Sequence, residues 1–147
     1  MGSLSLPASG LVYLDANPII YSVEKHPVYG PMLQPLWLAA QAGTIEVVSS
    51  DLVLMESLVG PLKSGDTRLQ SAYEDALLGT EMRLLPITQS ILREAARIRG
   101  TTKLKTPDAL HLATARQAGC VLFLTNDAGF RGNTNLPLVI LDDLLTP

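Results

Sequence analysis

Cysteine and histidine are nearly absent from this sequence of 147 residues. It has one cysteine, Cys120, and two histidines, so it can form no internal disulfide and lacks the histidine–cysteine pairs of zinc sites. Charged residues make up only 17% of the chain and hydrophobic residues 47%, which excludes a disordered chain. A chain of this length can bury enough surface to fold without cross-links. We therefore predict one domain over residues 1–147, with Cys120 as a small buried side chain.

Long apolar runs are missing as well. The longest uncharged stretch, Pro27 to Ile45, contains three prolines, two glutamines and two glycines, which does not suit a membrane-spanning helix. The N-terminus has no basic region, and Asp15 interrupts its apolar run, so we expect no signal peptide and a cytoplasmic protein. Glycine-rich loops of the Walker or dinucleotide type and a serine-hydrolase elbow are also absent, which argues against those enzyme classes.

Positive charge is scarce overall but concentrated in one segment. The net charge is −3, which by itself argues weakly against nucleic acid as a partner. Between residues 93 and 105, however, five basic residues accompany a single acid, Glu94, for a local charge of +4. A basic stripe of this kind can bind phosphate groups whatever the total charge. Its members are Arg93, Arg97, Arg99, Lys103 and Lys105.

Short apolar segments alternate with longer amphipathic ones, a pattern typical of an α/β fold with a mostly parallel sheet. The predicted strands are Leu11–Leu14, Ile45–Ser49, Met82–Ile87, Val121–Thr125 and Leu138–Leu141. The predicted helices start at Asn17-Pro18, near Met32, at Ser50 or Asp51, at Asp66, at Thr88 and at Thr106-Pro107-Asp108. We expect the helix near Met32 to stop at Gly43 and the helix after Thr88 to end at Gly100.

Four acids are candidates for a site: Asp15, Glu56, Asp108 and Asp127. Three of them lie at predicted strand-to-helix junctions or in a first helical turn, and Glu56 lies in the second turn after its strand. The carboxyl ends of parallel strands meet at one edge of a sheet, so these acids can converge there. Asp15 could simply cap a helix, but Asn17 before Pro18 already fits that position. Glu56 is the only charge between Asp51 and Lys63, and a charge in such an apolar helix must be paired or bound to metal unless its face is exposed.

The other two acids have ordinary structural explanations. Asp108 lies in a first helical turn, where acids are favoured, and Asp127 lies in a turn before glycine. Three further residues attract attention without joining the predicted site. His111 could shuttle protons, but its apolar neighbours favour an oriented core histidine, and we expect Asp142 and Asp143 to be solvated.

Clustered carboxylates would repel one another without a cation, and their oxygens suit hard divalent ions. We therefore predict a Mg²⁺ or Mn²⁺ site that activates water and stabilises charge on a phosphodiester.

At these motifs the chain resembles the PIN-domain ribonucleases, especially the VapC-like toxins of toxin–antitoxin pairs. The resemblance covers nearly the whole chain and rests on four segments in order. They are Leu-Asp-Ala-Asn-Pro-Ile-Ile-Tyr at 14–21, Ser-Xaa-Leu-Val-Leu-Met-Glu at 50–56, Thr-Pro-Asp-Ala-Leu-His-Leu-Ala-Thr-Ala at 106–115 and Leu-Thr-Asn-Asp-Ala-Gly-Phe at 124–130.

The resemblance implies a PIN-like three-layer α/β/α fold with a mostly parallel five-stranded sheet. It implies that Asp15, Glu56 and Asp108 face a metal ion and that Asp127 completes the pocket. Thr125 and Asn17 match supporting polar positions. It further implies metal-assisted hydrolysis of RNA, a cognate antitoxin and a homodimer. The uncharged segment from Val28 to Ala42 has enough apolar residues to supply such a dimer interface or, alternatively, to form a core helix.

Two other functions remain open at this stage. One is a Mg²⁺-dependent phosphatase for small molecules with Asp15 as nucleophile, although such enzymes of the haloacid dehalogenase type have a second acid where this chain has Asn17. The other is a non-catalytic module that binds RNA or protein on a PIN-like fold. Such a module would be expected to lack one or more of the four acids, and this chain has all four.

Overall fold

A sheet of five parallel strands runs through the centre of the protein in the order β3-β2-β1-β4-β5. The computed structural model describes residues 2–79 and 81–145. The central strand β1 pairs with β2 and with β4, so that Tyr13 lies beside Val48 on one side and Phe123 on the other. The strands are β1 (Leu11–Leu14), β2 (Glu46–Ser50), β3 (Arg83–Leu85), β4 (Leu122–Thr125) and β5 (Leu138–Ile140).

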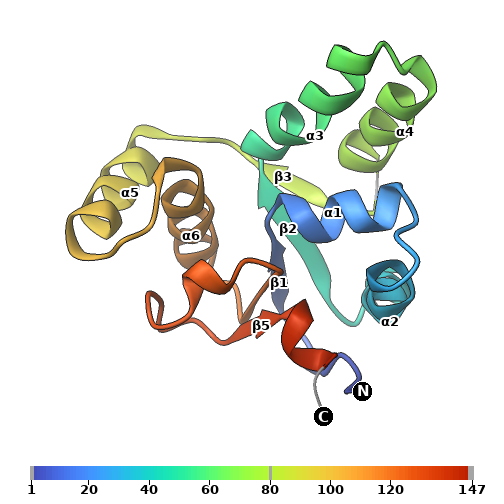
Figure 1. Ribbon diagram of the computed structural model, residues 1–147. Coiled ribbons are helices and arrows are strands. Elements are labelled where there is room, and N and C mark those ends of the chain that lie inside the picture. The colour runs from blue at the N-terminus through green and yellow to red at the C-terminus, as the bar shows by residue number, and fades with distance from the viewer. Residues whose placement is uncertain (1, 80, 146–147) are drawn as a thin grey trace.

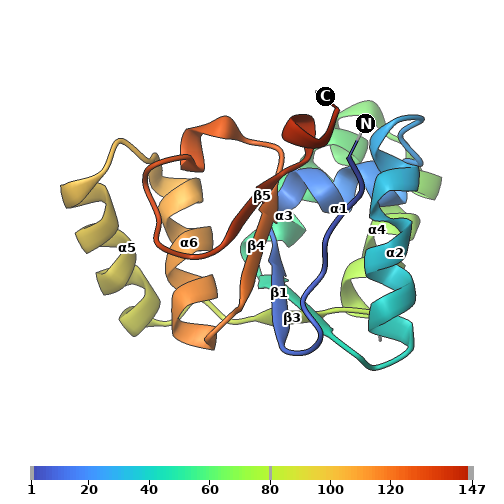
Figure 2. The ribbon, with the colours of Figure 1, turned by 90° about the horizontal axis from the view of Figure 1, so that it is seen from below.

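Helices cover both faces of this sheet (Figures 1 and 2). Helices α1 to α4 lie on one face and α5 and α6 on the other, which confirms the predicted three-layer α/β/α fold. The helices are α1 (Ala16–Val23), α2 (Tyr29–Gln41), α3 (Leu52–Ser64), α4 (Thr67–Leu78), α5 (Gln89–Thr101), α6 (Thr106–Ala118) and the short 3₁₀ helices η1 (Ala128–Phe130) and η2 (Leu141–Leu144).

The side chains of β1 alternate between two apolar cores. Val12 and Leu14 pack with residues of α1 to α4, whereas Tyr13 packs with residues of α5 and α6. All three are fully buried. A strand with both faces covered is expected in a parallel sheet, and it explains why this segment is a continuous apolar run.

Helix caps were predicted with mixed success. Asp66 and Thr88 cap α4 and α5 as expected, since their side chains accept the Leu69 and Ile91 amides. The predicted cap at Asn17 is wrong: α1 already begins at Ala16, with Asp15 at the N-cap position. Its side chain forms no cap hydrogen bond, because it is engaged elsewhere.

Other boundaries differ by one or two residues. Helix α6 begins at Thr106 rather than being capped by it, and α5 continues past Gly100 to Thr101. Cys120 is buried, as predicted. No helix within residues 2–79 and 81–145 combines the length and apolar character needed to cross a membrane.

Candidate active site

Asp15 is the most buried of the four acids. It follows β1 directly and is only 5% exposed. The Thr125 hydroxyl at the end of β4 donates to Asp15 Oδ2 at 2.6 Å, while Oδ1 has no hydrogen-bond partner in the described part of the chain. Burial raises the pKa of Asp15 to about 7, and repulsion from Asp108 and Glu56 adds to this rise. A buried carboxylate oxygen without a partner is costly, and a cation would satisfy it.

Glu56 lies in the second turn of α3 and is paired. Its Oε1 is 2.6 Å from His111 Nε2 on α6, and His111 Nδ1 is 2.6 Å from the Tyr13 hydroxyl on β1. His111 is 1% exposed, which confirms an oriented core histidine. Of the alternatives for a charge in this apolar helix, namely pairing, metal binding or an exposed face, the structure shows pairing and identifies His111 as the partner.

Asp108 and Asp127 are close enough to each other to interact electrostatically. Asp108 is half-buried in the first turn of α6, and burial together with the charges of Asp127 and Glu56 raises its pKa. Asp127 precedes η1 and accepts the Gly129 amide at 2.8 Å. The Asp127 amide in turn donates to Thr125 Oγ1, so one threonine organises two of the acids.

The four acids therefore share the carboxyl edge of the sheet and influence one another electrostatically. Within the described residues, however, no three of the side chains that bind metals lie close enough together to form a ready-made site. The residues still fit a divalent cation on two counts: one buried oxygen of Asp15 lacks a partner, and two carboxyl groups have raised pKa values. Carboxylate oxygens are also the ligands that Mg²⁺ and Mn²⁺ prefer.

Other predicted residues have simpler roles. Asn17 is part-buried in α1, and in the described structure its side chain forms no hydrogen bond to any of the four acids. The acids after the last strand are exposed, as expected. Asp143 pairs with Arg131, and Asp142 accepts the Tyr29 hydroxyl.

The sequence of this chain matches a known protein family. The family model described as PIN domain matches residues 12–134, which include all four acids. The chain belongs to the PIN domain family. No curated protein matched the chain.

Solved structures with the same fold include several complexes. VapBC2 from Rickettsia felis, bound to a DNA fragment from its promoter, superposes with a TM-score of 0.70 at 20% identity, over 88% of this chain and 98% of that one. DNA-bound VapBC from Salmonella typhimurium gives a TM-score of 0.67 at 18% identity, over 88% and 96%. VapC20 from Mycobacterium tuberculosis, a sarcin-ricin loop cleaving toxin, gives 0.63 at 17% identity, over 76% and 86%. These similarities establish the PIN fold.

The basic stripe of this PIN domain divides into two parts. At its start, Arg97 pairs with Glu94, which also contacts Arg116, so these charges partly cancel. At its end, Arg99 donates to Thr106 Oγ1 at 2.8 Å, and the charge of Lys105 offsets a small part of the rise in the pKa of Asp108. The end of the stripe therefore lies near Asp108.

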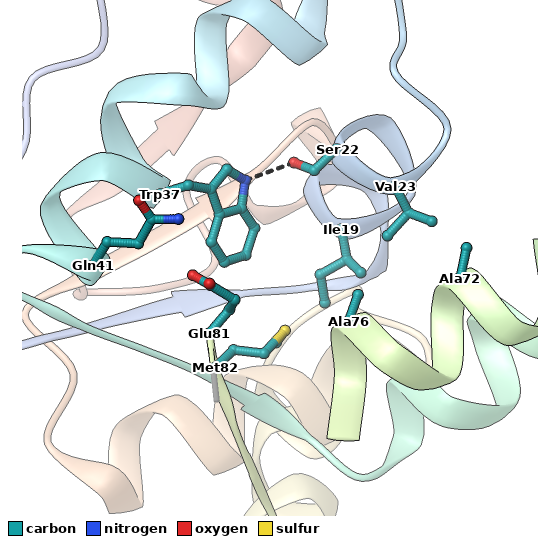
Figure 3. A pocket seen from close by; sticks show the side chains of 9 residues that line it. All are labelled: Ile19, Ser22, Val23, Trp37, Gln41, Ala72, Ala76, Glu81 and Met82. Atoms are coloured by element: carbon teal, nitrogen blue, oxygen red, sulfur yellow. Dashed lines mark hydrogen bonds between the residues drawn. The ribbon is translucent and has the colours of Figure 1, made fainter. Parts of the chain in front are cut away.

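A separate cavity of about 330 Å³ opens between α1, α2 and α4 (Figure 3). Its walls are mostly apolar, and the Trp37 ring forms one of them, held by a 2.9 Å hydrogen bond from Nε1 to Ser22 Oγ. None of the four acids lines it, so it is not the candidate active site. Its lining residues are Ile19, Ser22, Val23, Trp37, Gln41, Ala72, Ala76, Glu81 and Met82.

Proposed function

We propose that this PIN domain is a metal-dependent endoribonuclease that hydrolyses RNA phosphodiester bonds. The observation that carries the proposal is the buried Asp15, whose Oδ1 has no hydrogen-bond partner among the described residues and whose pKa is raised by Glu56 and Asp108. Such an arrangement is unfavourable for the apo protein and favourable once a cation is bound.

Each acid has a proposed role. Asp15, Glu56 and Asp108 would hold Mg²⁺ or Mn²⁺, and Asp127 would complete the acidic pocket. A bound divalent ion supplies an activated water and offsets charge on the phosphate. The protein's own contribution is orientation: Thr125 fixes Asp15 and the Asp127 backbone, and His111 fixes one oxygen of Glu56. Lys105 and Arg99 lie where the RNA phosphates would approach.

We further propose that the protein is the toxin of a toxin–antitoxin pair. Support comes from the structures that share its fold, among them two VapBC complexes and a toxin that cleaves the sarcin-ricin loop. A cognate antitoxin would cover apolar surface and could place an arginine among the carboxylates, where a planar guanidinium pairs with two oxygens. The cavity beside Trp37 is one apolar surface available to it.

The test is cleavage by the purified protein. Labelled single-stranded RNA should be cut with Mn²⁺ or Mg²⁺ and remain intact with EDTA, while p-nitrophenyl phosphate should not be hydrolysed. Turnover of the small phosphate ester with no RNA cleavage would instead support the phosphatase. RNA binding without cleavage would support the non-catalytic module.

A further inference from the structure

Two buried polar side chains form a hydrogen-bonded chain behind Glu56. Tyr13 Oη lies 2.6 Å from His111 Nδ1, and His111 Nε2 lies 2.6 Å from Glu56 Oε1. These three residues come from β1, α6 and α3. The Tyr13–His111–Glu56 relay therefore links the central strand to helices on different sides of the sheet, and it ends on one of the four acids.

The chemistry of the three groups fixes where the hydrogens lie. A carboxylate only accepts hydrogen bonds, so His111 Nε2 must carry a hydrogen. At neutral pH a tyrosine hydroxyl keeps its proton and can donate it to Nδ1. Of the two neutral tautomers of His111, only the one with its hydrogen on Nε2 can donate to Glu56 and accept the Tyr13 hydroxyl at Nδ1.

Packing holds the relay in one geometry. The Tyr13 ring stacks on Phe123 with ring centres 5.1 Å apart and meets the His111 ring edge-on at 5.7 Å. Phe123 is supported by Phe130 at 4.7 Å. Tyr13 and His111 have almost no exposed surface, so neither side chain can take another rotamer without displacing the core.

The side chains of His111 and Glu56 differ in how much of their surface is exposed to solvent. The His111 side chain is 2% exposed and cannot reach a substrate, whereas the Glu56 side chain is 25% exposed. His111 occupies Oε1, and within the described residues no hydrogen bond engages Oε2, which leaves that oxygen for an ion. Hydrogen-bond partners behind metal ligands commonly set both the direction and the affinity of those ligands.

We propose that Tyr13 and His111 are positioning residues that hold Glu56 so that its second oxygen faces a divalent cation. This inference rests on the proposed metal-dependent function. It adds that the relay determines metal affinity, although neither Tyr13 nor His111 contacts the ion.

Calorimetric titration of the metal-free protein with Mn²⁺ tests the proposal. His111→Leu should bind Mn²⁺ about 10- to 100-fold more weakly than wild type, as is usual when such a partner is removed. His111→Gln should recover part of that affinity, because its amide can still donate to Glu56. Tyr13→Phe, which keeps the ring and removes only the hydroxyl, should show a smaller decrease of about tenfold or less.

Matched controls are available away from the acids. Tyr73→Phe removes another buried tyrosine hydroxyl that donates to a carboxylate, that of Glu24. His26→Gln removes the other histidine, whose Nδ1 accepts backbone amides of Val28 and Tyr29. Both control variants should bind Mn²⁺ like wild type. If His111→Leu does not fold, as judged by circular dichroism, the hydroxyl deletion Tyr13→Phe decides.

Nitrogen NMR of the imidazoles gives a readout that needs no metal. With only two histidines, the His26 variant assigns both rings. His111 should carry its hydrogen on Nε2, and the opposite tautomer would overturn the relay. Wild-type Mn²⁺ affinity in both His111→Leu and Tyr13→Phe would overturn this inference alone. Failure of the wild type to bind Mn²⁺ would overturn the proposed function and the inference together.

Discussion

Thr125 holds one oxygen of Asp15 and leaves the other buried without a hydrogen-bond partner in the described structure. These residues are 110 positions apart in sequence and meet because β1 and β4 are neighbours in the sheet. The pairing orients the carboxylate but does not compensate for its burial, so the pKa of Asp15 rises to about 7. The candidate site thus carries an electrostatic cost that a bound cation would relieve.

That cost makes the stability of the metal-free protein depend on pH. An unfolded aspartate loses its proton near pH 4, whereas folded Asp15 keeps it until about pH 7, so folding is increasingly penalised between these values. The penalty reaches up to about 4 kcal/mol above pH 7. In EDTA, Asp15→Asn should therefore be more stable than wild type at pH 8 and lose this advantage near pH 4. Urea unfolding at several pH values measures the difference, with the exposed cap variant Asp66→Asn as control. An Asp15→Asn protein less stable than wild type at pH 8 would contradict the prediction.

The four acids should not contribute equally to RNA cleavage. Asp15→Asn, Glu56→Gln and Asp108→Asn should each abolish detectable cleavage while the protein stays folded. Asp127→Asn should retain part of the activity, because the Asp127 side chain already accepts the Gly129 amide and need not bind the ion directly. Cleavage rates at saturating Mn²⁺ test this order, and Asp142→Asn serves as an exposed acid outside the pocket. Full activity of Asp108→Asn would refute the assigned site.

RNA binding should depend on the end of the basic stripe that borders Asp108. Charge reversal at Lys103 and Lys105 should weaken binding and reduce the salt slope by roughly 0.7 for each RNA phosphate that these lysines no longer neutralise. Binding to labelled RNA at several salt concentrations measures this slope. Arg83→Glu reverses a charge at the start of β3, on the opposite edge of the sheet, and should leave the slope unchanged. An unchanged slope in the lysine variant would identify the stripe as an ordinary solvated surface.

Self-association is predicted from exposed apolar residues. In α2, Leu33 and Leu36 are buried and Leu38 is 57% exposed, so only part of the segment from Val28 to Ala42 is free for a partner. Helix α3 exposes a longer apolar row, formed by Met55, Val59 and Leu62. We expect a homodimer by light scattering that Val59→Asp dissociates and Leu38→Asp weakens less. A wild-type monomer mass independent of concentration would reject the dimer.

Expression in cells tests the toxin proposal. The wild-type protein should arrest growth when produced alone and be tolerated together with its antitoxin. Asp15→Asn should be tolerated without the antitoxin, because it lacks the central carboxylate. Growth curves at matched protein levels measure this contrast. Harmless wild-type protein with no small copurifying partner would favour a PIN nuclease with a housekeeping role in RNA processing.

Much of this architecture could be predicted from periodicity and turn residues. The strand at Leu11–Leu14 was placed correctly, and the other four strands were correct within about two residues at each end. The cap at Asn17 was misplaced because proline at the third helical position resembles proline at the first. Local sequence does not determine that difference of two residues.

The side chains that form hydrogen bonds to the acids were harder to predict. Thr125 was expected only from the family resemblance, and Tyr13 was missed, although a tyrosine in the middle of a buried strand must find a hydrogen-bond partner. That partner, His111, lies 98 residues away, and nothing in the sequence alone pairs these two positions. The places of Asp15, Asp108 and Asp127 at strand ends or in a first helical turn could be read from the sequence, as could that of Glu56 in a second helical turn, whereas the contacts that orient these acids depend on tertiary packing.

The placement of β1 at the centre of the sheet has a consequence for synthesis of the chain. β1 is synthesised before its neighbour β4, and helices α1 to α6 and strands β2 and β3 lie between them in the sequence. Parallel pairing across such a separation forms late, because a long loop must close first. A nascent chain that stops before β4 therefore lacks Thr125 and Asp127 and cannot assemble the acidic edge. The order of translation thus delays the assembly of the four acids until β4 and Asp127 have been made.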